Sequence, residues 1–115
     1  MSDLIYKIVS RTEWQAAESI GLFLGSVVDL QDGFVHFSTA DQAPETASKH
    51  FAGQSELVLV VVAASQLGDE LKWEPSRGGE LFPHLYSPLP VDAVNHVFDL
   101  ELDTDGKHIF PPEFW

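Results

Sequence analysis

Residues 72–90 read KWEPSRGGELFPHLYSPLP, and this stretch decides most of what we expect of the fold and the site. It holds four of the seven prolines and two of the eight glycines of the 115-residue chain. These residue types fix loop backbones, and loops on a rigid scaffold concentrate functional sites. We therefore expect a rigid loop, either as one wall of a site or as a surface connection whose aromatic side chains fill the core.

Two versatile side chains of this stretch, His84 and Tyr86, are two residues apart. In an extended segment this spacing places both side chains on the same face. Glu74, Ser76 and Arg77 precede them. An arginine next to two glycines can hold a phosphate or carboxylate in bidentate fashion, because glycine lets a ligand approach closely. The alternative is that Arg77 is a surface charge paired with a nearby glutamate.

A second candidate centre lies upstream, where residues 33–42 read GFVHFSTADQ. Residues 34–37 favour a short strand with His36 on an apolar face. A lone histidine there is more often a core residue with a satisfied partner. However, a strand end that meets a helix N-terminus binds anions and ligand hydroxyls, and Ser38 and Thr39 offer hydroxyl groups at the same place. Both interpretations of His36 stay open.

Hydrophobic patterning predicts the main elements. Residues 4–9 (LIYKIV) favour a strand. Ser10 and Glu13 form a capping box for a helix that aligns Trp14, Ala17 and Ile20 and ends at Gly21. Residues 23–30 favour neither helix nor strand, and a second helix is expected from an Asp41 cap to about Phe51, with Pro44 in its first turn. Residues 57–62 (LVLVVV) predict a central strand buried on both faces, and residues 94–102 a last strand.

This order of elements favours an α+β fold, because a doubly wound fold would need a helix after every strand. We expect a single α+β domain with two main helices over residues 1–102. Residues 103–115 form an aromatic tail that is either docked on the domain or mobile.

Composition limits the function. The net charge is −12, from 18 acids against 6 bases, and disfavours nucleic-acid binding because such a surface repels phosphates. There is no cysteine, which excludes thiolate metal sites and a cysteine nucleophile. No signal peptide or membrane span is evident, so we expect a soluble, cytoplasmic protein. A zinc site formed by His36, His50 and His84 matches no motif spacing, so no metal is expected.

Three motifs, IYKIVSRTEWQAA, GFVHFSTADQ and LKWEPSRGGELFPHLYSPLPVDAV, resemble a bacterial family catalogued as domain of unknown function 952. That family resembles a compact relative of the ADP-ribosyltransferase superfamily, near the tRNA 2′-phosphotransferases. The resemblance covers roughly residues 4–100. It implies a split, strongly bent β-sheet with a cleft that binds NAD in active relatives.

The resemblance also assigns residues. His36 stands where many transferases place a tyrosine against the nicotinamide, and Lys7 stands where a histidine usually contacts the ribose. His84 and Tyr86 line the same cleft, so His36 and His84 should be neighbours. The transferases use a glutamate to stabilise the ribosyl cation; no residue here matches it by motif, so Glu74 and Glu80 are named for it without one. The implied ligand-binding residues are Lys7, Ser38, Thr39, Trp73, Ser76, Arg77 and Tyr86, with His36 and His84 as the catalytic pair.

The sequence thus leaves two hypotheses. In the first, a histidine-lined cleft binds a nucleotide-like small molecule, and NAD is a substrate for ADP-ribosyl transfer or hydrolysis. In the second, the same scaffold is a non-catalytic ligand-sensing or protein-interaction domain, with the aromatic tail as its contact surface. In both, we expect a monomer or a weak homodimer.

Overall fold

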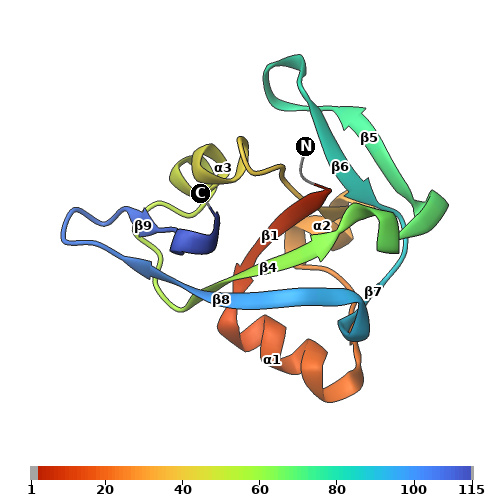
Figure 1. Ribbon diagram of the computed structural model, residues 1–115, viewed down its shortest axis with the longest axis horizontal. Coiled ribbons are helices and arrows are strands. Elements are labelled where there is room, and N and C mark those ends of the chain that lie inside the picture. The colour runs from red at the N-terminus through yellow and green to blue at the C-terminus, as the bar shows by residue number, and fades with distance from the viewer. Residues whose placement is uncertain (1–2, 115) are drawn as a thin grey trace.

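The computed structural model describes residues 3–114, apart from the side chains of Arg77 and Glu113. Within these residues the fold is α+β, as the sequence predicts (Figure 1). There are three α-helices rather than two, namely α1 (Arg11–Ile20), α2 (Val27–Asp32) and α3 (Ala43–His50). The strands are β1 (Leu4–Ser10), β2 (Leu22–Phe23), β3 (Val35–His36), β4 (Leu57–Ala63), β5 (Leu71–Pro75), β6 (Leu81–Leu85), β7 (Leu89–Pro90), β8 (Val94–Leu102) and β9 (His108–Ile109).

The strands form a curled antiparallel sheet with a seam. One part has the order β1-β4-β8-β9, and another has the order β3-β6-β5. An isolated bridge between Tyr6 and Ser38 joins the two parts, because each backbone N–H donates to the other residue's carbonyl at 2.8 Å. A separate two-stranded pairing of β2 with β7 lies beside the sheet.

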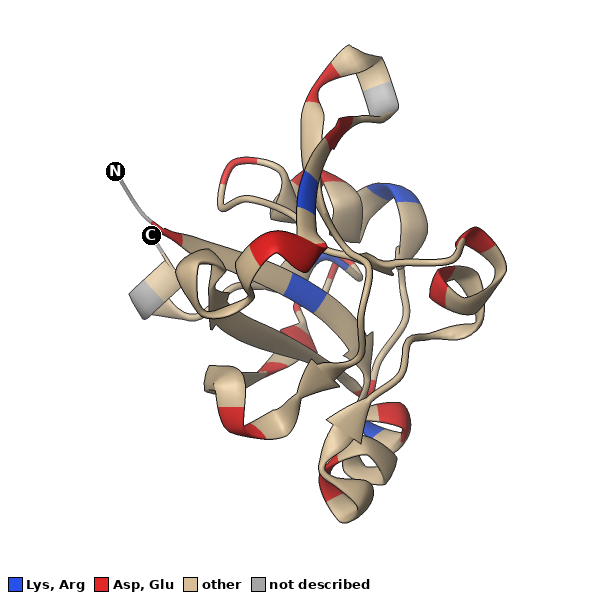
Figure 2. Cartoon of the chain, turned by 90° about the vertical axis from the view of Figure 1, so that its right-hand side faces the viewer, with Lys and Arg blue, Asp and Glu red and all other residues tan. Residues whose placement is uncertain are grey.

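Charged residues lie on the three α-helices, on β1, β5 and β8, and in the connecting turns. Figure 2 shows acids on helices, strands and turns, with the few bases scattered among them. The acids therefore do not gather in one tail. No helix within the described residues is long and apolar enough to cross a membrane.

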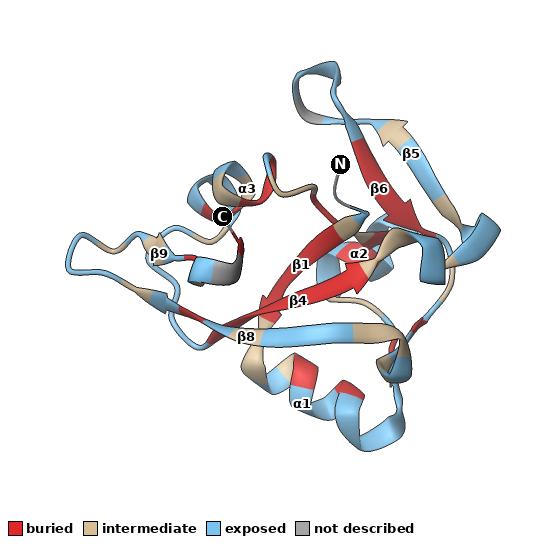
Figure 3. Cartoon of the chain, viewed as in Figure 1, coloured by how far each residue is buried: buried red, intermediate tan, exposed pale blue. Residues whose placement is uncertain are grey.

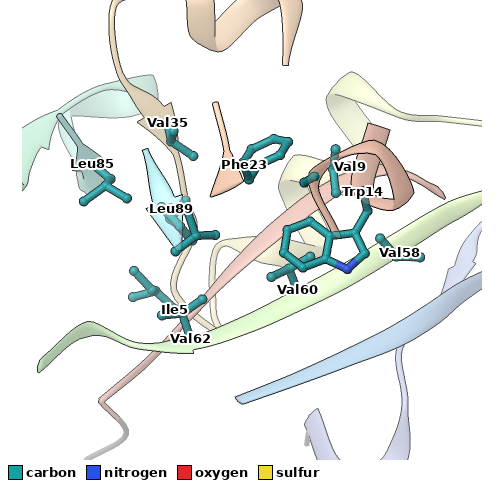
Figure 4. Close-up of a cluster of buried hydrophobic side chains, with 12 residues drawn as sticks. Ile5, Val9, Trp14, Phe23, Val35, Val58, Val60, Val62, Leu85 and Leu89 are labelled. Carbon is teal, nitrogen blue, oxygen red and sulfur yellow. The ribbon is translucent and has the colours of Figure 1, made fainter. Parts of the chain in front are cut away.

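Strand β4 lies at the centre of the core, as its continuous apolar run predicts. Six of its seven residues are buried, and Figure 3 shows the strand buried along most of its length. The buried residues alternate between two clusters on opposite faces. Val58, Val60 and Val62 face the cluster that contains Ile5 and Trp14 (Figure 4). The other cluster contains Leu57, Leu59, Val61, Tyr6, Phe110 and Phe114. Burial on both faces explains why no polar residue interrupts this strand.

Helix α1 begins and ends as predicted, but fewer of its residues are buried than predicted. The Ser10 side chain accepts a hydrogen bond from the Glu13 backbone N–H, and Gly21 ends the helix with a φ of 86°. Trp14 and Ala17 are buried, whereas Ile20 is 64% exposed, so the expected alignment of all three is wrong. With 3.6 residues per turn, two steps of three residues rotate by about 120° around the axis. Ile20 therefore points away from the sheet.

The predicted Asp41 cap of the second helix is also wrong. Helix α3 follows Gln42, whose side chain makes no capping bond. The cap-like exchange lies one turn earlier, where the Gln42 Oε1 accepts from the Thr39 N–H at 3.0 Å and the Thr39 hydroxyl accepts from the Gln42 N–H at 3.3 Å. Pro44 lies in the first turn as expected.

The sequence favours a short strand at residues 70–74, which β5 confirms, and a rigid loop after it, whereas β5 and β6 pair as a hairpin over residues 71–85. Pro83 lies inside β6, and it is one of the prolines and glycines for which the sequence favours a loop. Its carbonyl accepts from the Phe37 N–H at 3.0 Å, on the side that faces β3. Since proline has no N–H to return, the ladder between β3 and β6 stops there. The chain then crosses to β1 through Ser38.

The aromatic tail packs on the domain. Strand β9 pairs with β8, and Phe110 and Phe114 are buried in the second cluster. The Phe114 ring meets the edge of Tyr6 at a centroid distance of 4.9 Å. The prediction of an aromatic contact surface also included Trp115, which lies outside the described residues. Phe110 and Phe114 are therefore not available as a contact surface.

Candidate functional site

The site lies where the curled sheet splits. After the bridge between Tyr6 and Ser38, a continuing antiparallel ladder would place Ile8 opposite His36. Instead β1 and β3 separate, and both residues line a pocket of about 540 Å³. The other lining residues come from both sides of the split and from three helices, and they are Tyr6, Lys7, Val9, Glu13, Ser26, Val27, Val28, Asp29, Asp32, Phe37, Ser38, Thr46, His50, Phe51, Ser76, Phe82 and His84.

The Asp29 carboxylate lies between the separated strands β1 and β3. One of its carboxylate oxygens, Oδ1, accepts from the backbone N–H of His36 at 3.1 Å and lies 2.6 Å from the Nδ1 of the same histidine. The Lys7 ammonium lies 2.9 Å from Oδ2, and both side chains are buried, with residue exposures of 6% for Lys7 and 2% for Asp29. A buried ion pair of this kind keeps its geometry, because separating the two groups would leave each charge desolvated and without a counter-ion.

The sequence brings Asp29 to this place through a short capped helix. The Ser26 hydroxyl accepts from the Asp29 N–H, and the Asp29 carboxylate accepts from the Ser26 N–H at 2.9 Å. This capping box fixes the first turn of α2. Burial raises the pKa of Asp29, but the hydrogen bond from His36 and the Lys7 ammonium outweigh it and hold the pKa well below its usual range. The carboxylate is therefore ionised.

His36 is held between two acids. Its Nδ1 faces Asp29, and its Nε2 lies 2.9 Å from the Asp32 Oδ2 at the end of α2. Asp32 is about half exposed, so it lies at the open side of the pocket. The ring is therefore fixed in orientation by α2 at both of its nitrogens.

His84 is the more deeply buried imidazole, with 5% of its surface exposed. Its Nδ1 lies 2.7 Å from the Glu74 Oε1, and the Tyr86 hydroxyl donates to the same oxygen at 2.7 Å. The hydrogen bond from Tyr86, followed by that from His84, lowers the pKa of Glu74, and the bond to Glu74 raises the pKa of Tyr86. A carboxylate that accepts from Nδ1–H leaves Nε2 as a proton acceptor. No described residue gives Nε2 a hydrogen bond, and the side chain lines the pocket.

The two histidines are neighbours, as the sequence predicts. They lie opposite each other in the pairing of β3 with β6, and their ring centroids are 5.5 Å apart. Phe34 stacks on His84 at 4.1 Å and contacts His36 at 4.5 Å and Tyr86 at 5.2 Å. This aromatic cover keeps both imidazoles in place from one side.

The backbone of Ile8 also contributes to the pocket. In a strand, residues two apart direct their backbone groups the same way, so the N–H and C=O of Ile8 follow those of Tyr6 into the split. Tyr6 uses its groups for the bridge to Ser38. Among the described residues, no partner is found for those of Ile8. They offer one donor and one acceptor, side by side, to a ligand.

The predicted site residues fall into two groups. Lys7, Ser38 and Ser76 line the pocket together with His36 and His84. Thr39, Trp73 and Tyr86 do not. The Thr39 hydroxyl is bound to the start of α3, and Trp73 is half exposed on β5. Tyr86 contacts Glu74 and Phe34, which in turn contact His84. The side chain of Arg77 lies outside the described residues.

The sequence reasoning missed the acids of α2. Asp29 and Asp32 line the pocket and hold His36, and the spacing of Ser26 and Asp29 was the one signal that could have located them. His50 lines the pocket as well. Within the described residues, no group of three histidine or acidic side chains is close enough to hold a metal ion.

Comparison with known proteins identifies the family to which this chain belongs. The crystal structure of protein CC0527 from Caulobacter crescentus is 56% identical in sequence, with a TM-score of 0.92, over 96% of this chain and 97% of that chain. The solution NMR structure of CC0527 is 59% identical, with a TM-score of 0.84, over 91% and 90% of the two chains. None of the curated proteins matches the chain. Residues 8–97 match the family described as "Protein of unknown function (DUF952)", and the chain therefore belongs to this family.

Proposed function

We propose that the pocket binds a nucleotide-like small molecule, with His36 and His84 in contact with it. The observation that carries the proposal is the split of the sheet, which sets the backbone of Ile8 on one side against two fixed imidazoles on the other. A carboxamide or the edge of a heterocyclic base can donate to and accept from one backbone residue at once. The volume of about 540 Å³ suits a ligand of this size.

The finer form of the proposal is NAD hydrolysis or ADP-ribosyl transfer, and it is suggested by the resemblance of the sequence motifs to the ADP-ribosyltransferases. His84, oriented by Glu74, would accept the proton of the attacking water or hydroxyl group through its Nε2. The carboxylates of Glu13 and Asp32 line the same pocket, where negative charge would stabilise a ribosyl cation as it develops. Lys7 cannot serve the phosphates, because its ammonium is neutralised by Asp29.

A titration tests the binding step. On addition of NAD or ADP-ribose to about millimolar concentration, we expect the backbone amide signals of Ile8, His36 and His84 to shift in NMR spectra. The signal of His96, which is exposed on β8, should stay in place. If neither ligand moves the signals of the pocket residues at this concentration, the nucleotide proposal is wrong.

A substitution tests the chemical step. Replacing Glu74 by glutamine removes the charge that orients His84, so we expect nicotinamide release from NAD to fall by about 100-fold or more. Binding of NAD should change much less, because Glu74 does not line the pocket. The matched control is Glu101→Gln, an exposed acid on β8, and should leave the rate unchanged.

A non-catalytic ligand-sensing domain is the second candidate. It is favoured by Lys7, which the resemblance places where a transferase has a histidine, and which Asp29 holds rather than leaving it free to contact a ribose. This candidate predicts that the wild-type protein binds NAD or ADP-ribose without releasing nicotinamide. Measurement of nicotinamide alongside the NMR titration distinguishes the two.

A further inference from the structure

The surface around the end of α1 and the start of α2 is rich in exposed apolar side chains. Eleven large apolar side chains are exposed in the described part of the chain, and six of them fall within residues 20–30. Single exposed apolar residues are ordinary, whereas a gathering of them marks an interaction surface. The six are exposed by between 40% and 69%, and they are Ile20, Leu22, Leu24, Val27, Val28 and Leu30.

Three of these residues border a groove of about 200 Å³ between α1 and β2, which we call the α1–β2 groove. Ala17 and Phe23 line its buried side. Small-molecule pockets usually measure about 300–1,000 Å³, so this groove is better matched to one apolar side chain of a partner. Glu13 lines both this groove and the larger pocket, so an occupant would lie beside the candidate site. The exposed border residues are Ile20, Leu22 and Leu24.

The charge around the groove decides what kind of partner fits. Between Arg11 and Lys49 the chain has no lysine or arginine. Arg11 itself is paired with Glu56 and Asp99. Among the residues that line the groove in the described part of the chain, Glu13 is the charged one, and none is basic. A second copy, or an anionic membrane, would bring negative charge against negative charge.

We propose that the α1–β2 groove docks a basic amphipathic segment of another protein. A leucine-like or phenylalanine-like anchor of the segment occupies the groove against Phe23. A lysine or arginine beside the anchor faces Glu13. The apolar contact supplies affinity, and the charges steer association and exclude acidic partners.

The test uses two labelled synthetic peptides, one with leucines on one helical face and lysines on the other, and one with glutamate in place of every lysine. We expect the lysine peptide to bind the wild-type protein in fluorescence anisotropy and the glutamate peptide not to bind. The double variant Leu22→Ser, Leu24→Ser should weaken binding by about tenfold or more, because it removes the border of the groove. The control Ile109→Ser removes an equally exposed apolar side chain from β9 and should bind as the wild type does.

Several results would overturn the proposal. They are absence of binding by the lysine peptide, equal binding of both peptides, and unchanged binding by the groove variant. A wild-type dimer in sedimentation that the groove variant dissociates would assign the groove to a second copy instead. Circular dichroism checks that the variants fold, and Ile20→Ser on α1 replaces the double variant if that one does not.

Discussion

Asp29 connects three elements through one buried carboxylate. It belongs to α2, neutralises Lys7 of β1, and binds both the backbone and the ring of His36 of β3. Removing one member of a buried ion pair leaves the other charge desolvated and alone, which costs far more than the pair contributes. Both the fold of the split and the orientation of His36 therefore depend on this side chain.

We predict that Asp29→Asn lowers the free energy of unfolding by roughly 3–5 kcal/mol at neutral pH, because the Lys7 ammonium stays buried without its counter-ion. Urea denaturation followed by circular dichroism measures the loss. Asp92→Asn, which replaces an exposed acid in the turn after β7, is the control and should cost well under about 1 kcal/mol. A loss for Asp29→Asn no larger than that of the control would contradict the buried-pair argument.

Acid should weaken the wild-type protein through the same residue. The folded state holds the pKa of Asp29 below its ordinary value of 3.8, chiefly through His36 and Lys7 acting against burial. The stability from this group is therefore complete above pH 3.8 and is lost as the pH falls through the lower, folded pKa. Urea denaturation at falling pH should show this loss in the wild type. The Asp29→Asn variant should show a shallower dependence, and an equal slope would refute the assignment.

At the scale of residues, the sequence predicted the meeting of His36 with His84 but not their carboxylate partners. The histidines could be paired because each lies in a recognisable motif. Asp29 lies 22 residues from Lys7 and 7 from His36 along the chain, so only the folded position of α2 brings them together. The sequence analysis names Glu74 only as a candidate for the glutamate that stabilises the ribosyl cation, whereas its role in holding His84 follows from the β5–β6 hairpin.

At the scale of elements, α2 and the turn before it set the site. Gly25 adopts a φ of 123°, and a Cβ built on it would lie 2.8 Å from the Cβ of Asp29. Gly21 also has a positive φ, of 86°, but a Cβ there would meet nothing within 4 Å. A side chain at Gly21 would therefore add backbone strain alone, whereas a side chain at Gly25 would add backbone strain and a steric clash with Asp29.

We predict that Gly21→Ala costs about 1–2 kcal/mol of unfolding free energy from backbone strain alone. Gly25→Ala should cost more, by roughly a further 1–3 kcal/mol, because the added methyl group also displaces Asp29. Urea denaturation measures both losses. NMR spectra should show the His36 amide shifted in Gly25→Ala and unmoved in Gly21→Ala. Equal costs for the two variants would show that Asp29 has room to move.

Strands with a strong apolar pattern were predictable, whereas two short elements were not. Residues 57–62 read as a buried strand because burial on both faces leaves a continuous apolar run. Strand β6 was hidden by Pro83, since proline ordinarily argues against a strand with neighbours on both sides. Helix α2 has only six residues and exposes most of its apolar ones, so its pattern resembles no amphipathic helix.

At the scale of the whole molecule, the charge of −12 acts against compactness. Acids repel one another more strongly in the folded chain than in the expanded unfolded chain. We therefore predict that the thermal midpoint rises when salt is raised from about 10 mM to about 0.5 M, because screening shortens the reach of the repulsion. Thermal melts by circular dichroism measure the change. Melts in an uncharged solute at the same osmolarity are the control, because such a solute is excluded from the protein surface but does not screen charges. A midpoint that falls as salt is added would contradict the prediction.

The seam between Tyr6 and Ser38 has a consequence for motion. Two backbone hydrogen bonds join the parts of the sheet there, while β1 keeps its full pairing with β4 and β6 keeps its pairing with β5. Bending at this line would leave both ladders paired and would change the width of the pocket, while the contacts of Asp29 with Lys7 and His36 also span the split. A ligand bound to Ile8 on one side and His84 on the other would act as a missing rung. A ligand bound in the pocket would then slow amide hydrogen exchange along the seam. It would also couple the motion of the β1-β4-β8-β9 part of the sheet to that of the β3-β6-β5 part.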